Sequence, residues 1–130
     1  MAGRNHTEGR PMVAAARIRE VERTLDQLLD WCCRGALASS HGRTGVFRFV
    51  VDTPVGTRTR YVIATDQGCS TAHTIAHPPN ATLSLSQENL TRLALGDLRG
   101  ALAFATGRLQ IEGDIFLAMN WIDQLGRSPL

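Results

Sequence analysis

The spacing of apolar residues changes period twice along the 130 residues, and this change most constrains the fold. In residues 12–34, apolar side chains recur three and four positions apart, which predicts an amphipathic helix: Ile18, Val21, Leu25, Leu28 and Cys32. Alternation with a period of two follows and predicts strands over residues 46–52, 57–64, 69–75 and 81–85. A helical period then returns. This succession indicates an α+β domain.

The second half carries start and stop signals of its own. Ser86 is a good N-cap for a helix that Gly96 ends, and Asp97 predicts the cap of a further short helix. Residues 108–112 alternate as a strand, and Asp114 predicts the cap of a last helix. We therefore expect a five-stranded, largely antiparallel (mixed) sheet covered by helices.

The length of the chain predicts one folded unit. Residues 1–11 are polar and contain glycine, so we expect a disordered N-terminal lead, with a single domain over residues 12–130. Gly35 predicts the end of the first helix. Its stripe is short and broad for a coiled coil, which favours packing against the sheet.

Charge excludes one class of partner. All fourteen basic residues are Arg, the net charge is only +2, and the arginines are scattered. A nucleic-acid surface needs a stripe of one sign with interleaved aromatic residues, so we expect no nucleic-acid partner. In the first helix the charges of both signs predict a solvated face that is paired within the helix: Arg17, Arg19, Glu20, Glu22, Arg23 and Asp26. In residues 57–64, Arg58 and Arg60 alternate in a hairpin for which we expect one face in water.

The cysteines and the hydropathy pattern bear on location. Three cysteines, of which Cys32 and Cys33 are adjacent, do not suggest a disulfide framework, which favours a reducing cytoplasm. We expect Cys32 to be a small buried apolar residue. No run of apolar residues approaches the length of a membrane span, and the first eleven residues do not resemble a secretory signal. The expectation is a cytoplasmic protein.

The sequence predicts neither a metal site nor a familiar catalytic motif. Cys69, His73 and His77 are four residues apart, but in an extended segment the outer two would lie about 26 Å from each other, so we expect no metal. Nucleophile elbows, phosphate loops and dinucleotide fingerprints are absent from the sequence, which argues against an enzyme without deciding the question.

The last helix is unusually apolar, with only Asn120, Asp123 and Gln124 as a polar strip. Core packing, a homodimer face, a membrane-surface helix and the wall of an apolar cavity all remain open, although the strip lacks the basic residues of a membrane-surface helix.

Residues 80–122 resemble the sterol carrier protein type 2 family of small lipid-transfer domains. The matching features, in order, are ATLSLS, LALGD, an aromatic at Phe104, GRLQIEGD and the LAM step that ends at Met119. The upstream order agrees, with a long helix before GVFRFVVD and RYVIA. The resemblance implies a curved sheet covered by helices, an apolar tunnel between them and no cofactor. It implies a hydrophobic ligand such as a fatty acid, sterol, acyl-CoA or phospholipid. By this analogy the tunnel is lined by Phe47, Phe49, Leu83, Leu85, Leu93, Phe104, Leu109, Ile111, Phe116, Met119 and Ile122.

The sequence also departs from this family. Asn120-Trp121-Ile122 stands where members often carry Lys or Leu-Gln after the LAM step, so the Trp121 ring is in a position to narrow or cap the tunnel. The chain ends Arg-Ser-Pro-Leu, which is not a peroxisomal signal of the Ser-Lys-Leu type. We expect a carrier of a hydrophobic molecule. The alternatives are a small biosynthetic enzyme that uses the same cavity, with Tyr61, His73 or His77 as polar groups, and a partner-binding domain.

Overall fold

The structure is a computed structural model that describes residues 2–39, 44–65 and 68–123. Its elements, in chain order, are α1 (Ala2–Ser39), β1 (Gly45–Thr53), β2 (Gly56–Thr65), β3 (Gly68–Ala72), β4 (Ala81–Ser86), α2 (Gln87–Leu95), α3 (Gly100–Ala105), β5 (Leu109–Gly113) and α4 (Ile115–Ile122). Residues 66 and 67, and Gln124 of the polar strip expected on the last helix, lie outside the described residues.

The strands form one mixed sheet in the order β3-β2-β1-β4-β5. β1 lies at the centre, antiparallel to β2 and parallel to β4, and the remaining pairs are antiparallel. The predicted α+β fold with a five-stranded, largely antiparallel sheet is confirmed. The one parallel pair arises because the chain returns from the β3 edge to the free side of β1.

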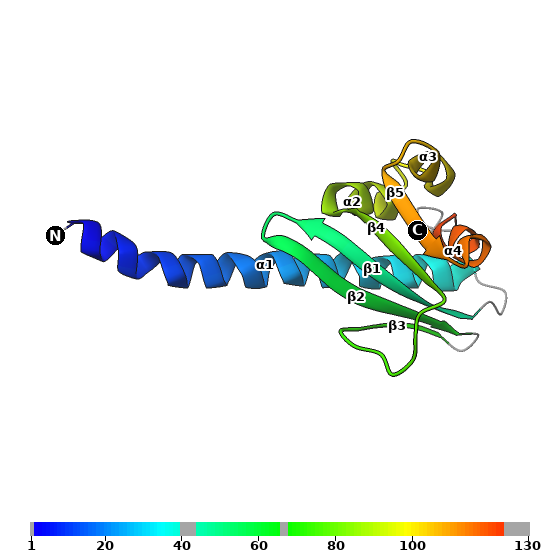
Figure 1. Cartoon of the computed structure of the whole chain (residues 1–130), viewed down its shortest axis with the longest axis horizontal. Coiled ribbons are helices and arrows are strands. Elements are labelled where there is room, and N and C mark those ends of the chain that lie inside the picture. The colour runs from blue at the N-terminus through cyan, green and yellow to red at the C-terminus, as the bar shows by residue number, and fades with distance from the viewer. Residues whose placement is uncertain (1, 40–43, 66–67, 124–130) are drawn as a thin grey trace.

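Alternation along β1 decides which face of the sheet is covered. Phe47, Phe49 and Val51 are buried, whereas the residues between them are half-buried. The register places Phe49 opposite Leu83 of β4, and Leu83 opposite Ile111 of β5, so one apolar face runs across the three strands. The helices lie against one side of the sheet, and the other side is open (Figure 1). The core therefore forms a single layer between the sheet and the helices.

The first helix is longer than its apolar stripe predicts. α1 runs from Ala2 to Ser39, and its N-terminal part projects beyond the sheet (Figure 1). The expected end at Gly35 is wrong, because one glycine costs a helix only about 1 kcal/mol and the buried Cys32 and Cys33 hold this turn in the core. The helix begins at residue 2 in the structure, and the disordered lead over residues 1–11 stays a prediction. The domain boundary at residue 12 stays a prediction.

Capping at the later helices is mostly as predicted. The Ser86 side chain accepts from the amide of Asn89, and Gly96 ends α2 in the left-handed conformation. The Asp114 carboxylate accepts from the amide of Leu117 at the start of α4. The predicted cap at Asp97 is wrong, since α3 begins at Gly100. The Asp97 amide instead donates to the carbonyl of Arg92 and closes the end of α2.

Two glycines permit close approaches, one between α3 and α4 and one between the end of β5 and the start of β4. A Cβ at Gly100 would overlap the side chain of Ile122, so glycine lets α3 lie directly against α4. Gly113 has a φ of +93°, and a Cβ there would lie 2.6 Å from the carbonyl oxygen of Asn80. Glycine is required at this position for both reasons.

Among the described residues, no helix combines the length and the apolar character needed to span a bilayer.

Candidate functional site

The helix-covered face of the sheet brings together most of the residues predicted to bind a ligand. Six of them come from strands and are buried: Phe47, Phe49, Leu83, Leu85, Leu109 and Ile111. Leu93 of α2 and Ile122 of α4 cover them and are also buried, and Met119 packs against the same core while partly exposed. These side chains form one continuous apolar layer. That any of them contacts a ligand stays a prediction.

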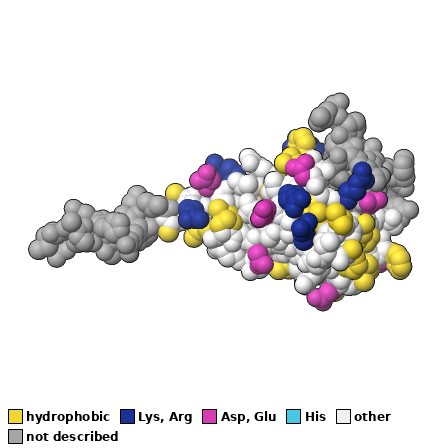
Figure 2. Space-filling view, turned by 90° about the horizontal axis from the view of Figure 1, so that it is seen from above, with side chains coloured by type: hydrophobic (Ala, Val, Ile, Leu, Met, Phe, Trp, Pro, Cys, Tyr) yellow, Lys and Arg dark blue, Asp and Glu magenta, His cyan; other side chains and the backbone are white. Residues whose placement is uncertain are grey.

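Two predicted residues lie elsewhere. Phe116 points away from the core and is 85% exposed, and Phe104 on α3 is also exposed. Helical periodicity explains the difference, because Ala118, Trp121 and Ile122 occupy the face of α4 that meets the sheet. Figure 2 shows hydrophobic side chains gathered on the surface at the end of the molecule that carries α4. The exposed large apolar residues of α3 and α4 are Leu102, Phe104, Ile115 and Phe116.

Trp121 fills the space between α4 and the centre of the sheet. Its ring centroid lies 5.3 Å from that of Phe47 and 5.8 Å from that of Phe49, the second in an edge-to-face arrangement. These distances are typical of favourable aromatic pairs. An apolar tunnel is not shown in the part of the chain that the structure describes, and the indole is packed where such a space would meet β1.

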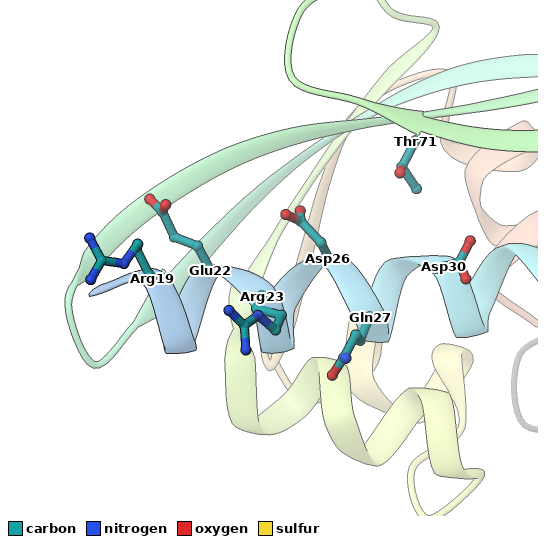
Figure 3. A pocket seen from close by; sticks show the side chains of 7 residues that line it. All are labelled: Arg19, Glu22, Arg23, Asp26, Gln27, Asp30 and Thr71. Atoms are coloured by element: carbon teal, nitrogen blue, oxygen red, sulfur yellow. The ribbon is translucent and has the colours of Figure 1, made fainter. Parts of the chain in front are cut away.

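A polar groove of about 530 Å³ lies along α1 beside the edge strand β3 (Figure 3). Figure 3 shows Glu22, Asp26 and Asp30 on the side of α1 that faces the sheet, and Thr71 of β3 points from the sheet toward the helix. The remaining lining residues are Arg19, Arg23 and Gln27, so all but Thr71 come from one helix. The groove is charged and open, and it does not resemble a site for an apolar guest.

Two carboxylates of this groove bind arginines of β2. Arg58 Nε donates to Glu22 Oε2 at 2.6 Å, and Arg60 Nε donates to Asp26 Oδ1 at 2.9 Å. The predicted pairing of these acids within the helix is therefore wrong. β2 turns Arg58 and Arg60 toward α1, in the same alternation as Val62 and Ala64, so they do not lie on a face in water. Arg60 is the one buried charged residue among those described.

The candidate polar groups for catalysis do not reach the helix-covered face. Tyr61 lies on the other face of the sheet, where its hydroxyl accepts from Arg48 Nε at 3.4 Å. His73 and His77 are exposed and follow β3, and His73 Nε2 lies 3.7 Å from Asp26 Oδ2. The apolar layer thus contains none of these three residues.

The cysteines differ from their prediction. Cys33 of α1 and Cys69 of β3 form a disulfide across 36 residues, which attaches the helix to the edge strand. The expectation of no disulfide is wrong, because spacing in the sequence does not show which elements meet. The bond also occupies Cys69, one of the residues weighed as a metal ligand. Cys32 is a free buried thiol, as expected, and burial raises its pKa to about 12.

A comparison with protein families shows to which family this chain belongs. The SCP-2 sterol transfer family matches residues 25–125, which is most of the chain and all of the sheet. The chain belongs to this family. The predicted resemblance is confirmed, and the matched region includes the helix-covered face and α4. A comparison with curated protein sequences finds no match.

Solved structures of the family share the fold at low sequence identity. The crystal structure of sterol carrier protein 2 like 2 from Aedes aegypti is 15% identical, with a TM-score of 0.61, and the match covers 78% of this chain and 95% of that one. The solution structure of palmitated SCP2L2 from the same organism is 17% identical, with a TM-score of 0.56 and coverage of 69% and 84%. A ubiquinone synthesis protein, UbiJ-SCP2, is 16% identical, with a TM-score of 0.55 and coverage of 92% and 98%. At these identities the likeness shows the fold.

Proposed function

We propose that this protein binds and carries a lipid or another hydrophobic small molecule between the helix-covered face of the sheet and the helices α2 and α4. The observation that carries the proposal is the family match, because it spans the whole apolar layer described above. The palmitated structure of a family member supports a guest with a long apolar chain. Burial of such a chain gains about 0.8 kcal/mol per CH₂ group, enough to drive binding without a cofactor.

The residues that would contact the guest are those of the apolar layer. Phe47, Phe49, Leu83 and Ile111 form its floor, and Met119 of α4 adds a flexible side chain that adapts to different guests. The exposed Phe116 would lie at the rim, where a guest passes from water to the core. Binding therefore requires the helices to separate from the sheet by the width of an acyl chain.

Native mass spectrometry of the purified protein tests the proposal, followed by extraction and identification of whatever co-purifies. A bound fatty acid, sterol or phospholipid supports the carrier function. A protein that is empty, and stays empty with a panel of fatty acids, sterols and phospholipids, contradicts it. The Leu83→Asn variant should abolish uptake, because it places an unpaired amide on the floor of the apolar layer.

A second candidate is a role in biosynthesis. The likeness to a ubiquinone synthesis protein over nearly the whole chain supports it, since a dry apolar cavity can hold a hydrophobic metabolite during a reaction. Tyr61, His73 and His77 lie away from the apolar layer, which favours the carrier over the enzyme. Turnover of the co-purified molecule, detected as a change of its mass, would favour the enzyme.

Location and assembly remain expectations within this proposal. The cysteine content alone favours the cytoplasm, but the Cys33–Cys69 disulfide removes that argument, since such bonds persist mainly in oxidising compartments. A homodimer through the apolar surface of α3 and α4 is likewise a proposal, and light scattering of the purified protein tests it.

A further inference from the structure

The indole N–H of Trp121 is a buried polar group without a partner. The side chain is only 7% exposed, and Nε1 makes no hydrogen bond within the described structure. Trp31 provides the comparison within the same chain. It is 41% exposed, yet its Nε1 donates to the carbonyl of Ala94 at 3.1 Å. The more deeply buried of the two indoles is therefore the one whose donor is unused.

This arrangement is unusual because buried donors are almost always paired. Trp121 has aromatic neighbours in Phe47 and Phe49, neither of which offers an acceptor of ordinary strength. A phenylalanine would fill much of the same volume and leave no donor unsatisfied. The unpaired donor is thus a cost to the folded protein that any molecule bringing an acceptor would remove.

We propose that the Trp121 indole N–H is a specificity-determining donor, which binds a carbonyl oxygen on the hydrophobic guest between β1 and α4. This inference rests on the proposed function, and it narrows the class of ligand. A pure hydrocarbon leaves the donor unpaired, whereas a molecule with a ketone or ester carbonyl satisfies it.

The charges around the site favour a neutral carbonyl over a carboxylate. The described core has one buried charged residue, Arg60, and its guanidinium is already bound to Asp26. A carboxylate at Trp121 would be a buried anion without a cation beside it, which is strongly unfavourable. The preferred guest therefore combines an apolar chain with an uncharged carbonyl group.

The position of Trp121 on α4 gives the guest a path to the donor. α4 spans only Ile115–Ile122, and Asp114 alone joins it to β5. Ala118, Trp121 and Ile122 are its buried residues, whereas Ile115 and Phe116 stay exposed on the adjoining surface. A small displacement of this helix uncovers the indole next to an apolar surface that the chain of the guest can follow.

The test compares two isosteric probes, 2-dodecanone and 2-methyl-1-dodecene, in which a C=CH₂ group replaces the carbonyl. Dissociation constants are measured by displacement of the methyl ester of a fluorescent fatty acid, which carries a neutral carbonyl group. We expect the affinity of the ketone relative to the alkene to be about tenfold higher in the wild-type protein than in Trp121→Phe, because the ketone loses its hydrogen bonds to water in both and regains one only from the indole. Trp31→Phe, which removes the other indole, should leave this ratio at its wild-type value. Both probes are measured on the same sample of each variant. Partial unfolding then weakens both apparent affinities equally and leaves their ratio unchanged.

Fluorescence gives a second readout of the same contact. In the Trp31→Phe variant Trp121 is the single tryptophan, and its emission should shift to longer wavelength with the ketone and not with the alkene. A ratio of ketone to alkene affinity that Trp121→Phe leaves unchanged overturns the inference and leaves the carrier function standing. Failure of both probes and of the lipid panel overturns the two together.

Discussion

Replacing Asp26 and replacing Arg60 should destabilise the protein unequally, although the two side chains form one ion pair. The Arg60 side chain is 8% exposed, and its Nε lies 2.9 Å from Asp26 Oδ1, while the carboxylate is partly open to water. Asp26→Ala therefore leaves a buried cation without its partner. Arg60→Met removes the charge and keeps an apolar stem of similar length. We expect the first substitution to destabilise the fold far more than the second.

The magnitude follows from the burial of the two partners. Coulomb attraction at 2.9 Å is about 1.4 kcal/mol in water and about 6 kcal/mol at an effective dielectric constant of 20. Breaking a fully buried pair costs about 3–5 kcal/mol, and the exposed side of Asp26 reduces this. We expect Asp26→Ala to lower the free energy of unfolding by about 2–3 kcal/mol, and Arg60→Met by under about 1 kcal/mol.

Urea denaturation followed by circular dichroism measures these differences. The double variant should be about as stable as Arg60→Met alone, since no buried charge remains for the carboxylate to neutralise. Glu22→Ala is the matched control, because its partner Arg58 is 22% exposed and regains water, at a cost of about 1 kcal/mol or less. Equal losses for Asp26→Ala and Glu22→Ala would refute the reasoning from burial.

Three further predictions concern the cysteines and the glycines. Reduction of the Cys33–Cys69 disulfide, which closes a 36-residue loop, should lower the free energy of unfolding by about 4 kcal/mol; equal urea midpoints with and without reductant would contradict this. The pKa of Cys32, raised from 9.0 to about 12, means that the unfolded thiol ionises first as the pH rises above about 9, so stability should fall by about 1.4 kcal/mol per pH unit. Thermal unfolding between pH 8 and 10.5 measures this slope, and a slope that persists in Cys32→Ala excludes the thiol as its source. Gly113→Ala should cost at least about 2 kcal/mol in urea, whereas Gly107→Ala, with a φ of +77° but open space around it, should cost only about 1 kcal/mol. Similar losses for the two would show that the close contact with the backbone does not matter.

The sheet could be predicted from the sequence because its strands alternate clearly. Phe47, Phe49 and Val51 share one face in a run of nine residues, and the buried residues of β4 follow the same rule. In β2 the sequence does not show which face of the strand is buried. Arg58 and Arg60 have the same parity as the buried Val62 and Ala64, but two arginines in a pattern of this kind indicate a face in water. Only the carboxylates of α1, more than thirty residues away, explain why they face inward.

The candidate site was predictable in outline and not in its details. The apolar residues of β1, β4 and β5 gather as the resemblance implies, because the register of the sheet brings them together. The exposure of Phe116 follows from the rotation of α4, which its nearly uniform apolar sequence does not fix. The unpaired indole of Trp121 and the disulfide of Cys33 depend on tertiary contacts, and no local pattern signals either.

The central position of β1 has a consequence for biosynthesis. A ribosome that elongates from the N-terminus completes β1, β2 and β3 before β4 exists, so β1 has one neighbour and an open parallel edge. At ordinary elongation rates the segment between β1 and β4 takes on the order of seconds to translate. During that interval Phe47 and Phe49 lack the cover that β4 and the later helices supply, and such an edge invites pairing with other chains. Synonymous codons that slow residues 54–80 should therefore reduce the soluble yield of this protein without changing a single amino acid.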